Sequence, residues 1–317
     1  MKLLEFVMQF PDESSCIAKL KEIRDKQEKI CPICGSDDFY WKSDKLCYEC
    51  KHCHHRMSIR TGTVMENSKL PFRYWFIAIH LLTATKQSFS AMELQHQLGH
   101  KRYQPIWEML HKLRNVMGKR DSRYTLSGEM EIDEGFFSTE CPDEEKDEPL
   151  KAGSGSQKKS KVLVMVESSD VENPKNPKKP KKVNHLKMEV LDDLKASTID
   201  KTMEGKVDTE SSITTDASKS HSHLHKNYRK HKSQVVEPEE ISKILPWVHI
   251  AISNAKSLFT NIYHGIKPKF LQEYLNEFCY KFNRKYFGER LFDRLLLISA
   301  TYETDFKHRI YNHDYRI

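Results

Sequence analysis

The spacing of apolar side chains predicts helices at both ends of the chain. Between 70 and 117, apolar residues return every three or four positions, which places them along one face of a helix. The same spacing occurs in 1–25 and from 246 to 300, where glycine and proline divide the last stretch into three helices. Helical segments therefore flank the middle of the chain on both sides.

The middle of the chain carries the pattern of a sheet. Four segments are short, rich in apolar residues and bounded by polar loops, which favours strands. They cover 128–137, 161–168, 185–191 and 211–216. The region from 140 to 183, around the second segment, is rich in Lys and Pro. We interpret its loops as solvated, with direct contact to DNA as the alternative.

A histidine-rich segment follows the fourth predicted strand. Residues 217–234 read ASKSHSHLHKNYRKHKSQ and include His221, His223, His225 and His231. We predict an exposed basic helix and turn here. A second metal site built from these histidines is the alternative.

Composition and charge narrow the class of protein. The chain has 317 residues, enough for two or three domains, and a net charge of +7, which suggests an anionic partner such as nucleic acid. Five of its eight cysteines lie between 31 and 53. No secretory signal is apparent and no apolar run is long enough to cross a membrane. We therefore expect a reduced intracellular protein whose clustered cysteines bind metal.

The cysteine cluster has the spacing of a zinc ribbon. Cys31 with Cys34, and Cys50 with Cys53, each form a Cys-x-x-Cys pair in a tight turn. Four such thiolates supply the tetrahedral shell that Zn²⁺ prefers. Cys47 and Cys50 also have the Cys-x-x-Cys spacing. Cys47 lies in the strand expected to lead into the second turn, so we favour Cys50 with Cys53 as ligands. So small a module needs zinc for its folding, on the order of 10 kcal/mol.

The predicted helices before the sheet resemble a helix-turn-helix. Ser90 can cap a short helix, Gly99 can end it, and a longer helix with basic and polar residues follows. This arrangement is typical of a DNA-binding helix-turn-helix, and an ordinary helical bundle is the alternative. The basic residues that we predict to bind DNA are Lys101, Arg102, Lys112 and Arg114.

Side chains with oxygen donors lie on two strands of the predicted sheet and on a later helix. Asp133 lies in the first strand, Asp216 ends the fourth, and Asn254 lies on a later helix. In an RNase H-like fold the first and fourth strands are neighbours, so the two carboxylates converge and a helix brings the third group over them. Side chains alternate along a strand, so Glu131 shares a face with Asp133, and the spacing does not choose between them.

Oxygen ligands of this kind suit Mg²⁺ or Mn²⁺. Two such ions about 3.5–4 Å apart activate a nucleophile and stabilise the leaving oxygen of a phosphodiester. The sequence therefore predicts a metal-dependent phosphodiester chemistry.

Several segments resemble one known family. They are CPICGS, SAMELQHQLG, MEIDEGFF, VHIAISNAK and YHGIKPKFLQEYLNEFCYKFNRKYFGERLFDRLL, which run in family order from 31 to about 297. The chain resembles zinc-ribbon insertion-sequence transposases of the DDE superfamily, in the ISXO-like group with an Asp-Asp-Asn triad. The resemblance implies an α/β fold, with an RNase H-like (retroviral-integrase-like) catalytic domain preceded by a zinc ribbon and a helix-turn-helix.

The resemblance also assigns roles to residues. It implies Asp133 and Asp216 as the first two members of the triad, Asn254 as the third, and Lys256 as the basic residue that follows. It implies Zn²⁺ on the same four cysteines. An amide binds metal more weakly than a carboxylate, so we expect weaker occupancy of one metal, with Lys256 or a DNA phosphate completing the site. Residues 140–160 depart from the family because they carry the acidic CPDEEKDE.

The domains implied are an N-terminal helix at 1–30, a zinc ribbon at 31–60, a helix-turn-helix region at 70–120, a catalytic domain at 125–300 and a tail at 301–317. The implied function is a transposase that binds the terminal inverted repeats of an insertion sequence in double-stranded DNA. It would cleave the ends by metal-dependent hydrolysis and join the 3′-hydroxyls to target DNA. A homo-oligomer on DNA in the bacterial cytoplasm is expected, with no membrane partner. The alternatives are a DNA-binding regulator with an inactive catalytic domain and a structure-selective nuclease.

Overall fold

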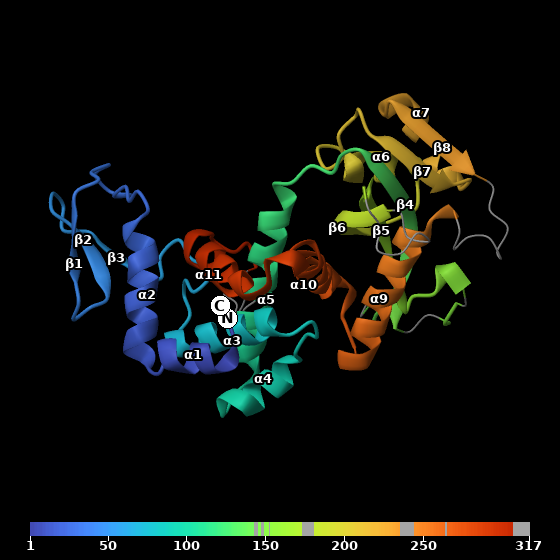
Figure 1. Ribbon diagram of the computed structural model, residues 1–317. Coiled ribbons are helices and arrows are strands. Elements are labelled where there is room, and N and C mark those ends of the chain that lie inside the picture. The colour runs from blue at the N-terminus through green and yellow to red at the C-terminus, as the bar shows by residue number, and fades with distance from the viewer. Residues whose placement is uncertain are drawn as a thin grey trace. The chain divides into compact units, whose positions relative to one another are not determined.

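The protein divides into two compact units in a computed structural model (Figure 1). One unit combines Met1–Met117 with the chain from Phe287 onward, and the other is Gly118–Tyr286. The structure describes residues 1–142, 145–146, 149–151, 153–172, 181–234, 244–263 and 265–306. The Lys- and Pro-rich stretch at 173–180 and the tail beyond 306 lie outside the described residues.

The first unit begins with two helices where one was predicted. α1 (Leu3–Gln9) ends before Pro11, which has no backbone N–H to continue the helix. α2 (Glu13–Asp25) then starts afresh, because the Asp12 carboxylate accepts a hydrogen bond from the Ser15 backbone N–H at 2.8 Å. The single helix expected over 1–25 was therefore wrong.

The ribbon is a small antiparallel sheet of three strands, β1 (Phe39–Lys42), β2 (Cys47–Cys50) and β3 (Arg56–Ser58). β2 pairs with both of its neighbours. The predicted hairpin is confirmed. The third strand, β3, was not predicted, because its residues are mostly polar.

The helices of the predicted helix-turn-helix are α4 (Ala91–Leu98) and α5 (Tyr103–Ser122). The Ser90 hydroxyl accepts a hydrogen bond from the Glu93 backbone N–H at 3.0 Å, and Gly99 ends α4 with φ +60°. A left-handed φ favours glycine because it has no Cβ to clash. The cap and the stop are both confirmed.

The last helix completes the core of the first unit. In α11 (Leu291–Thr301), the Phe292 ring lies 5.8 Å from Phe6 and 5.7 Å from Phe10 between centroids, and 6.4 Å from Phe76 in α3 (Phe72–Ala84). The Val64 backbone N–H also donates to the Ser299 carbonyl at 3.0 Å. The boundary expected at 300 therefore falls near 286, because α11 is apolar and is buried among these aromatic rings.

The second unit is built on a five-stranded sheet in the order β6-β5-β4-β7-β8. β4, β5 and β6 are antiparallel neighbours, whereas β7 runs parallel to both β4 and β8. The strands are β4 (Glu129–Ser138), β5 (Lys159–Asp170), β6 (Lys181–Leu191), β7 (Ser212–Asp216) and β8 (Lys230–Gln234). The first strand of the unit lies beside the fourth, as an RNase H-like fold requires.

The fifth strand was not predicted. The segment expected to be a basic helix and turn contains a 3-10 turn at Lys219–His221, the short α7 (Leu224–Asn227) and then β8. β8 reads KHKSQ and is an edge strand that pairs only with β7 among the described residues. Polar residues suit an edge strand, so the apolar alternation that reveals interior strands is missing.

The two faces of the sheet pack against different helices. Phe137 and the valines of β5 share one apolar cluster with α9 (Pro246–Ile262) and α10 (Leu271–Asn283). Ile132 and Ile213 share the other with α6 (Ala196–Met203). Residues 131, 133, 135 and 137 of β4 therefore face α9. None of the described helices is long and apolar enough to cross a membrane.

Candidate active site

Glu131 caps the helix that packs over β4. Its Oε2 accepts hydrogen bonds from the backbone N–H groups of Trp247 and Val248, at 2.8 and 3.0 Å. These groups lie in the first turn of α9, where the N-cap residue Leu245 has no side chain that can accept. The alternation of side chains along the strand allowed either Glu131 or Asp133 to be the metal-binding acid. In the structure Glu131 caps α9, and Asp133 is the acid that approaches Asp216.

Replacing Glu131 by Ala should lower the free energy of unfolding by about 1 kcal/mol, the usual cost of a lost helix cap. Glu131→Gln should cost less, because its amide oxygen still accepts from α9. Urea unfolding followed by circular dichroism measures both. The matched control is Glu129→Ala on the same strand, where the exposed side chain pairs only with Lys181 among the described residues. Equal stabilities for the Ala variants at 129 and 131 would contradict the capping role.

Asp133 is a largely buried carboxylate with two other carboxylates close to it. Its Oδ1 accepts from the Glu134 backbone N–H at 2.8 Å, and its Oδ2 lies 3.7 Å from His249 Nε2. Burial, together with the charges of Asp216 and Glu134, raises the pKa of Asp133 to about 6. A cation bound here would relieve the repulsion.

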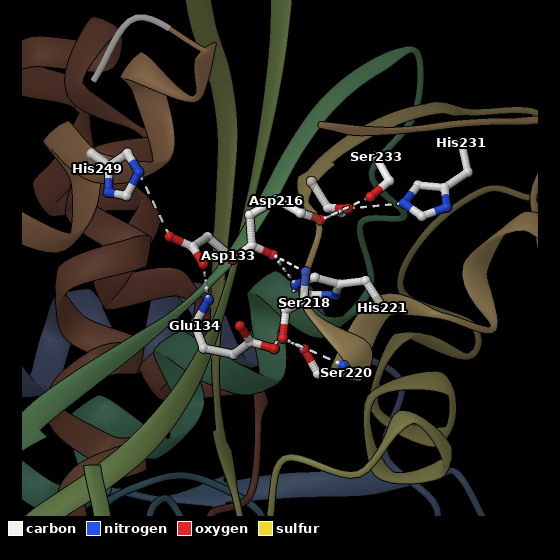
Figure 2. Close-up of polar contacts among 10 residues, drawn as sticks. Asp133, Glu134, Asp216, Ser218, Ser220, His221, His231, Ser233 and His249 are labelled. Carbon is white, nitrogen blue, oxygen red and sulfur yellow. Dashed lines mark hydrogen bonds and ion pairs between the residues drawn. The ribbon is translucent and has the colours of Figure 1, made fainter. Parts of the chain in front are cut away.

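Asp216 meets Asp133 because of the strand register. Glu131 pairs with Thr214 in the parallel β4–β7 ladder, so two residues further on Asp133 lies opposite Asp216. The Ser218 backbone N–H donates to Asp216 Oδ1 at 3.1 Å. The carboxylates of Asp133 and Asp216 and a ring nitrogen of His221 all lie within 4.8 Å of one another (Figure 2). The convergence predicted from sequence is present.

His221 and Glu134 are the groups that sequence reasoning missed. His221 is 1% exposed, and its Nε2 lies 3.4 Å from Glu134 Oε1 and 3.5 Å from Asp216 Oδ1. Burial lowers the pKa of His221, but the carboxylates of Glu134, Asp216 and Asp133 together outweigh burial and leave that pKa raised. The prediction of an exposed histidine run was wrong for His221. The only sequence signal was its position five residues after Asp216.

The other histidines have different partners. His223 Nδ1 lies 3.0 Å from Asp200 Oδ2, and His231 Nε2 lies 2.9 Å from the Thr215 hydroxyl. They do not converge with His221 on a second site of their own.

Asn254 does not share the side of α9 that faces Asp133. It is exposed and follows His249 by five residues, which turns it about 140° around the helix. Lys256 returns to the side of His249, and its Nζ lies 5.8 Å from the Phe137 ring centroid. Burial and Lys159 lower the pKa of Lys256, whereas the Asp133 charge opposes this. Asn254 as a metal ligand remains a prediction from the resemblance, and this arrangement gives it no place beside the aspartates.

The four predicted zinc ligands form one group. Cys31 Sγ lies 3.5 Å from Cys53 Sγ, and Cys34 Sγ lies 3.6 Å from Cys50 Sγ. Backbone N–H groups of Cys53 and His52 point at the Cys50 sulfur and lower its pKa to about 6, which favours the thiolate that binds metal. Cys47 lies outside the group, within the ladder of β2. The donor set and its spacing fit Zn²⁺.

Two of the four predicted DNA contacts are buried. Lys112 is 5% exposed, and its Nζ donates to the Glu66 carbonyl at 3.1 Å and pairs with Glu108 at 3.2 Å. Arg114 is 1% exposed. The prediction for both was wrong, because α5 is buried around much of its circumference and is not a surface helix. Lys101 and Arg102 are exposed at the turn before α5.

The fold and the site together define a class. The strand order, with two carboxylates on neighbouring parallel strands, is that of an RNase H-like domain. Residues 125–283 match the family of ISXO2-like transposase domains, and the chain belongs to this family.

A relative from an insertion sequence agrees with this assignment. It is 23% identical over 166 residues and is described as an uncharacterized protein in transposable element ISH50 of Halobacterium salinarum. The match covers 50% of this chain and 55% of the relative, so it spans about half of each protein.

Proposed function

We propose that the chain is a DNA transposase that cuts the ends of its insertion sequence and joins them to target DNA. The observation that carries this proposal is the convergence of Asp133 and Asp216 within a domain of the transposase family. Membership of the family supports action on DNA. The steps below extend that support with the chemistry of the site.

The catalytic step needs a divalent cation, Mg²⁺ or Mn²⁺, held by Asp133 and Asp216. When bound, the cation would activate a nucleophile and stabilise the leaving oxygen. In the first reaction water attacks the phosphorus at the element end, and the bond to the 3′-oxygen breaks to free a 3′-hydroxyl. In the second, that hydroxyl attacks a target phosphodiester and displaces the target's own 3′-oxygen. Lys256 supplies a positive charge for the phosphate beside Asp133.

The first unit would hold the element ends. Its ribbon and the α4–α5 pair are the parts expected to recognise the terminal inverted repeats, with Lys101 and Arg102 on phosphates. Both residues line a hollow of 710 Å³ together with Lys69 and His100. Joining two ends in one reaction requires two copies of the site, so we propose a homo-oligomer on DNA.

Lys101→Ala and Arg102→Ala should weaken DNA binding and reduce its dependence on salt. If each side chain neutralises one phosphate, each change lowers the slope of log K against log salt by about 0.9. Fluorescence anisotropy with a labelled end duplex, at several salt concentrations, measures the slope. Lys26→Ala is the control, because that lysine is exposed just after the end of α2 and pairs with Glu22. If the salt dependence of DNA binding in these variants equals that of Lys26→Ala, Lys101 and Arg102 do not contact DNA phosphates.

The function itself is tested by strand cleavage. A labelled duplex that carries the element end is incubated with the protein and Mg²⁺ or Mn²⁺, with chelator as the control. Metal-dependent nicking at the end, followed by joining to a second duplex, is the expected result. Tight, salt-sensitive binding without cleavage in either metal would overturn the proposal and indicate a DNA-binding regulator.

A further inference from the structure

The chain turns sharply after Asp216 and carries His221 back into the interior. The Ser218 backbone N–H donates to Asp216 Oδ1 at 3.1 Å, and the Ser218 hydroxyl accepts from the Ser220 backbone N–H at 3.4 Å. The 3-10 turn at Lys219–His221 follows at once. This local geometry places the imidazole beside the carboxylate that precedes it by five residues, as Figure 2 shows.

Within the described part of the chain, the buried ring of His221 makes no hydrogen bond. Neither Nδ1 nor Nε2 has a hydrogen-bond partner among the described residues, and the side chain is 1% exposed. A buried polar group without a partner costs free energy, so such groups need an explanation. Glu134 Oε1, which faces Nε2 at 3.4 Å, also has no hydrogen-bond partner among the described residues.

The charged groups around His221 favour a cation. Three carboxylates, those of Asp133, Glu134 and Asp216, face the ring from β4 and from the end of β7. Two further histidines lie near this group: His249 approaches Asp133 from α9, and His231 on β8 is close enough for the charge of His221 to lower its pKa. A ring nitrogen of His221 lies within 4.8 Å of carboxylate oxygens from both aspartates, which is close enough for one ion to bind all three.

We infer that His221 is a direct ligand of the divalent cation held by Asp133 and Asp216. This inference rests on the proposed function, because it concerns the same metal site. His221 occupies the third position that sequence reasoning gave to Asn254. Glu134 Oε1 lies 3.4 Å from His221 Nε2, the nitrogen that also faces Asp216, so its negative charge adds to that of the two aspartates around the cation.

A nitrogen ligand changes the preference of the site among metals. Mg²⁺ favours an all-oxygen octahedral shell, whereas imidazole ligands suit transition metals. Two carboxylates and one imidazole therefore bind Mn²⁺ more tightly than Mg²⁺. His221→Asp replaces the nitrogen ligand by an oxygen ligand. The affinities of the site for Mn²⁺ and Mg²⁺ should therefore differ less in this variant than in the wild-type protein.

The competing explanation is that His221 only pairs with Glu134 and Asp216, while the metal is held by the acids and water. The two arrangements differ in whether an imidazole nitrogen is bonded to the metal. Pulsed electron paramagnetic resonance of bound Mn²⁺ reports this directly, because a coordinated nitrogen modulates the electron spin echo. The measurement uses the full chain with Mn²⁺ alone and without DNA, so it does not depend on activity.

The wild-type protein should bind Mn²⁺ and show nitrogen modulation, and His221→Ala should lose the modulation and bind Mn²⁺ at least about tenfold more weakly. His223→Asn is the matched control, since that exposed histidine pairs with Asp200. His249→Asn tests the other nearby imidazole. Both should keep the modulation. The wild-type protein alone shows whether an imidazole nitrogen is bonded to Mn²⁺, so the test does not depend on correct folding of His221→Ala. If that variant misfolds, loss of the nitrogen modulation in His221→Asp identifies His221 as the ligand.

Mn²⁺ bound without nitrogen modulation overturns the inference, as does modulation that persists in His221→Ala or disappears in His249→Asn. Absence of Mn²⁺ binding without DNA also overturns it, because the inferred site is preformed. Failure of the proposed function looks different, since the duplex is then not cleaved in any metal. Cleavage that requires Asp133 and Asp216 but shows no bound nitrogen would refute only the role of His221.

Discussion

Asp133→Asn is expected to abolish metal-dependent strand cleavage and, at the same time, to stabilise the metal-free protein above pH 6. The loss of cleavage should exceed the roughly 10- to 100-fold that removal of an outer-sphere partner costs, because a charged ligand is removed. Asp216→Asn should abolish cleavage equally. Single-turnover cleavage of a labelled end duplex measures both, with DNA binding followed in parallel.

The gain in stability follows from the raised pKa of Asp133. Folding moves this pKa from an ordinary value of 3.8 to about 6, so the folded state binds the proton more tightly than the unfolded chain. Stability therefore falls as the pH rises from about 4 to about 6, and the ionised carboxylate then costs up to about 3 kcal/mol. Asn carries no such charge, so the variant should lose this pH dependence.

Glu129→Gln is the matched control for the Asp133 variant. Glu129 lies on the same strand with an exposed side chain, so its replacement should leave both cleavage and the pH dependence unchanged. Cleavage retained in Asp133→Asn would remove this residue from the catalytic site. Lost cleavage together with lost stability at pH 7 would indicate damage to the fold.

The second large effect concerns zinc. Cys50→Ser should release stoichiometric Zn²⁺, unfold the ribbon and abolish binding to the element ends, while the five-stranded sheet stays folded. Zinc supplies on the order of 10 kcal/mol to a module of this size. Metal analysis measures the loss of zinc. Tryptophan fluorescence measures the unfolding of the ribbon, because Trp41 lies on β1 and packs on Tyr48.

Cys47 offers the control for that experiment. It lies on the same strand as Cys50, three residues away, but outside the group of four. Cys47→Ser should retain zinc and DNA binding. Loss of zinc from the Cys47 variant and its retention in the Cys50 variant would reverse the ligand assignment.

Local spacing predicted the features that depend on neighbouring residues. The two Cys-x-x-Cys pairs, the Ser90 cap and the four strands with apolar interiors each rest on a pattern a few residues long. The meeting of Asp133 with Asp216 was also predicted, because the strand order of an RNase H-like fold makes their strands adjacent.

Features that depend on packing between segments far apart in the sequence could not be predicted from local spacing. Glu131 and Asp133 share a strand face, and only the first turn of α9 distinguishes them. Lys112 and Arg114 have the composition of surface residues, yet α5 is enclosed by other elements. His221 differed from its neighbouring histidines only through the turn that buries it.

The packing of α11 into the first unit has a consequence for synthesis of the chain. The unit that opens the sequence receives part of its core from Phe292, so the sheet unit is an insertion within it. During translation the sheet unit emerges whole before the first unit obtains its final helix. A ribosome that stops after Tyr286 therefore releases a complete sheet unit together with a first unit that still lacks its last helix. Only a product that extends through α11 contains both the sheet unit and the full core of the first unit.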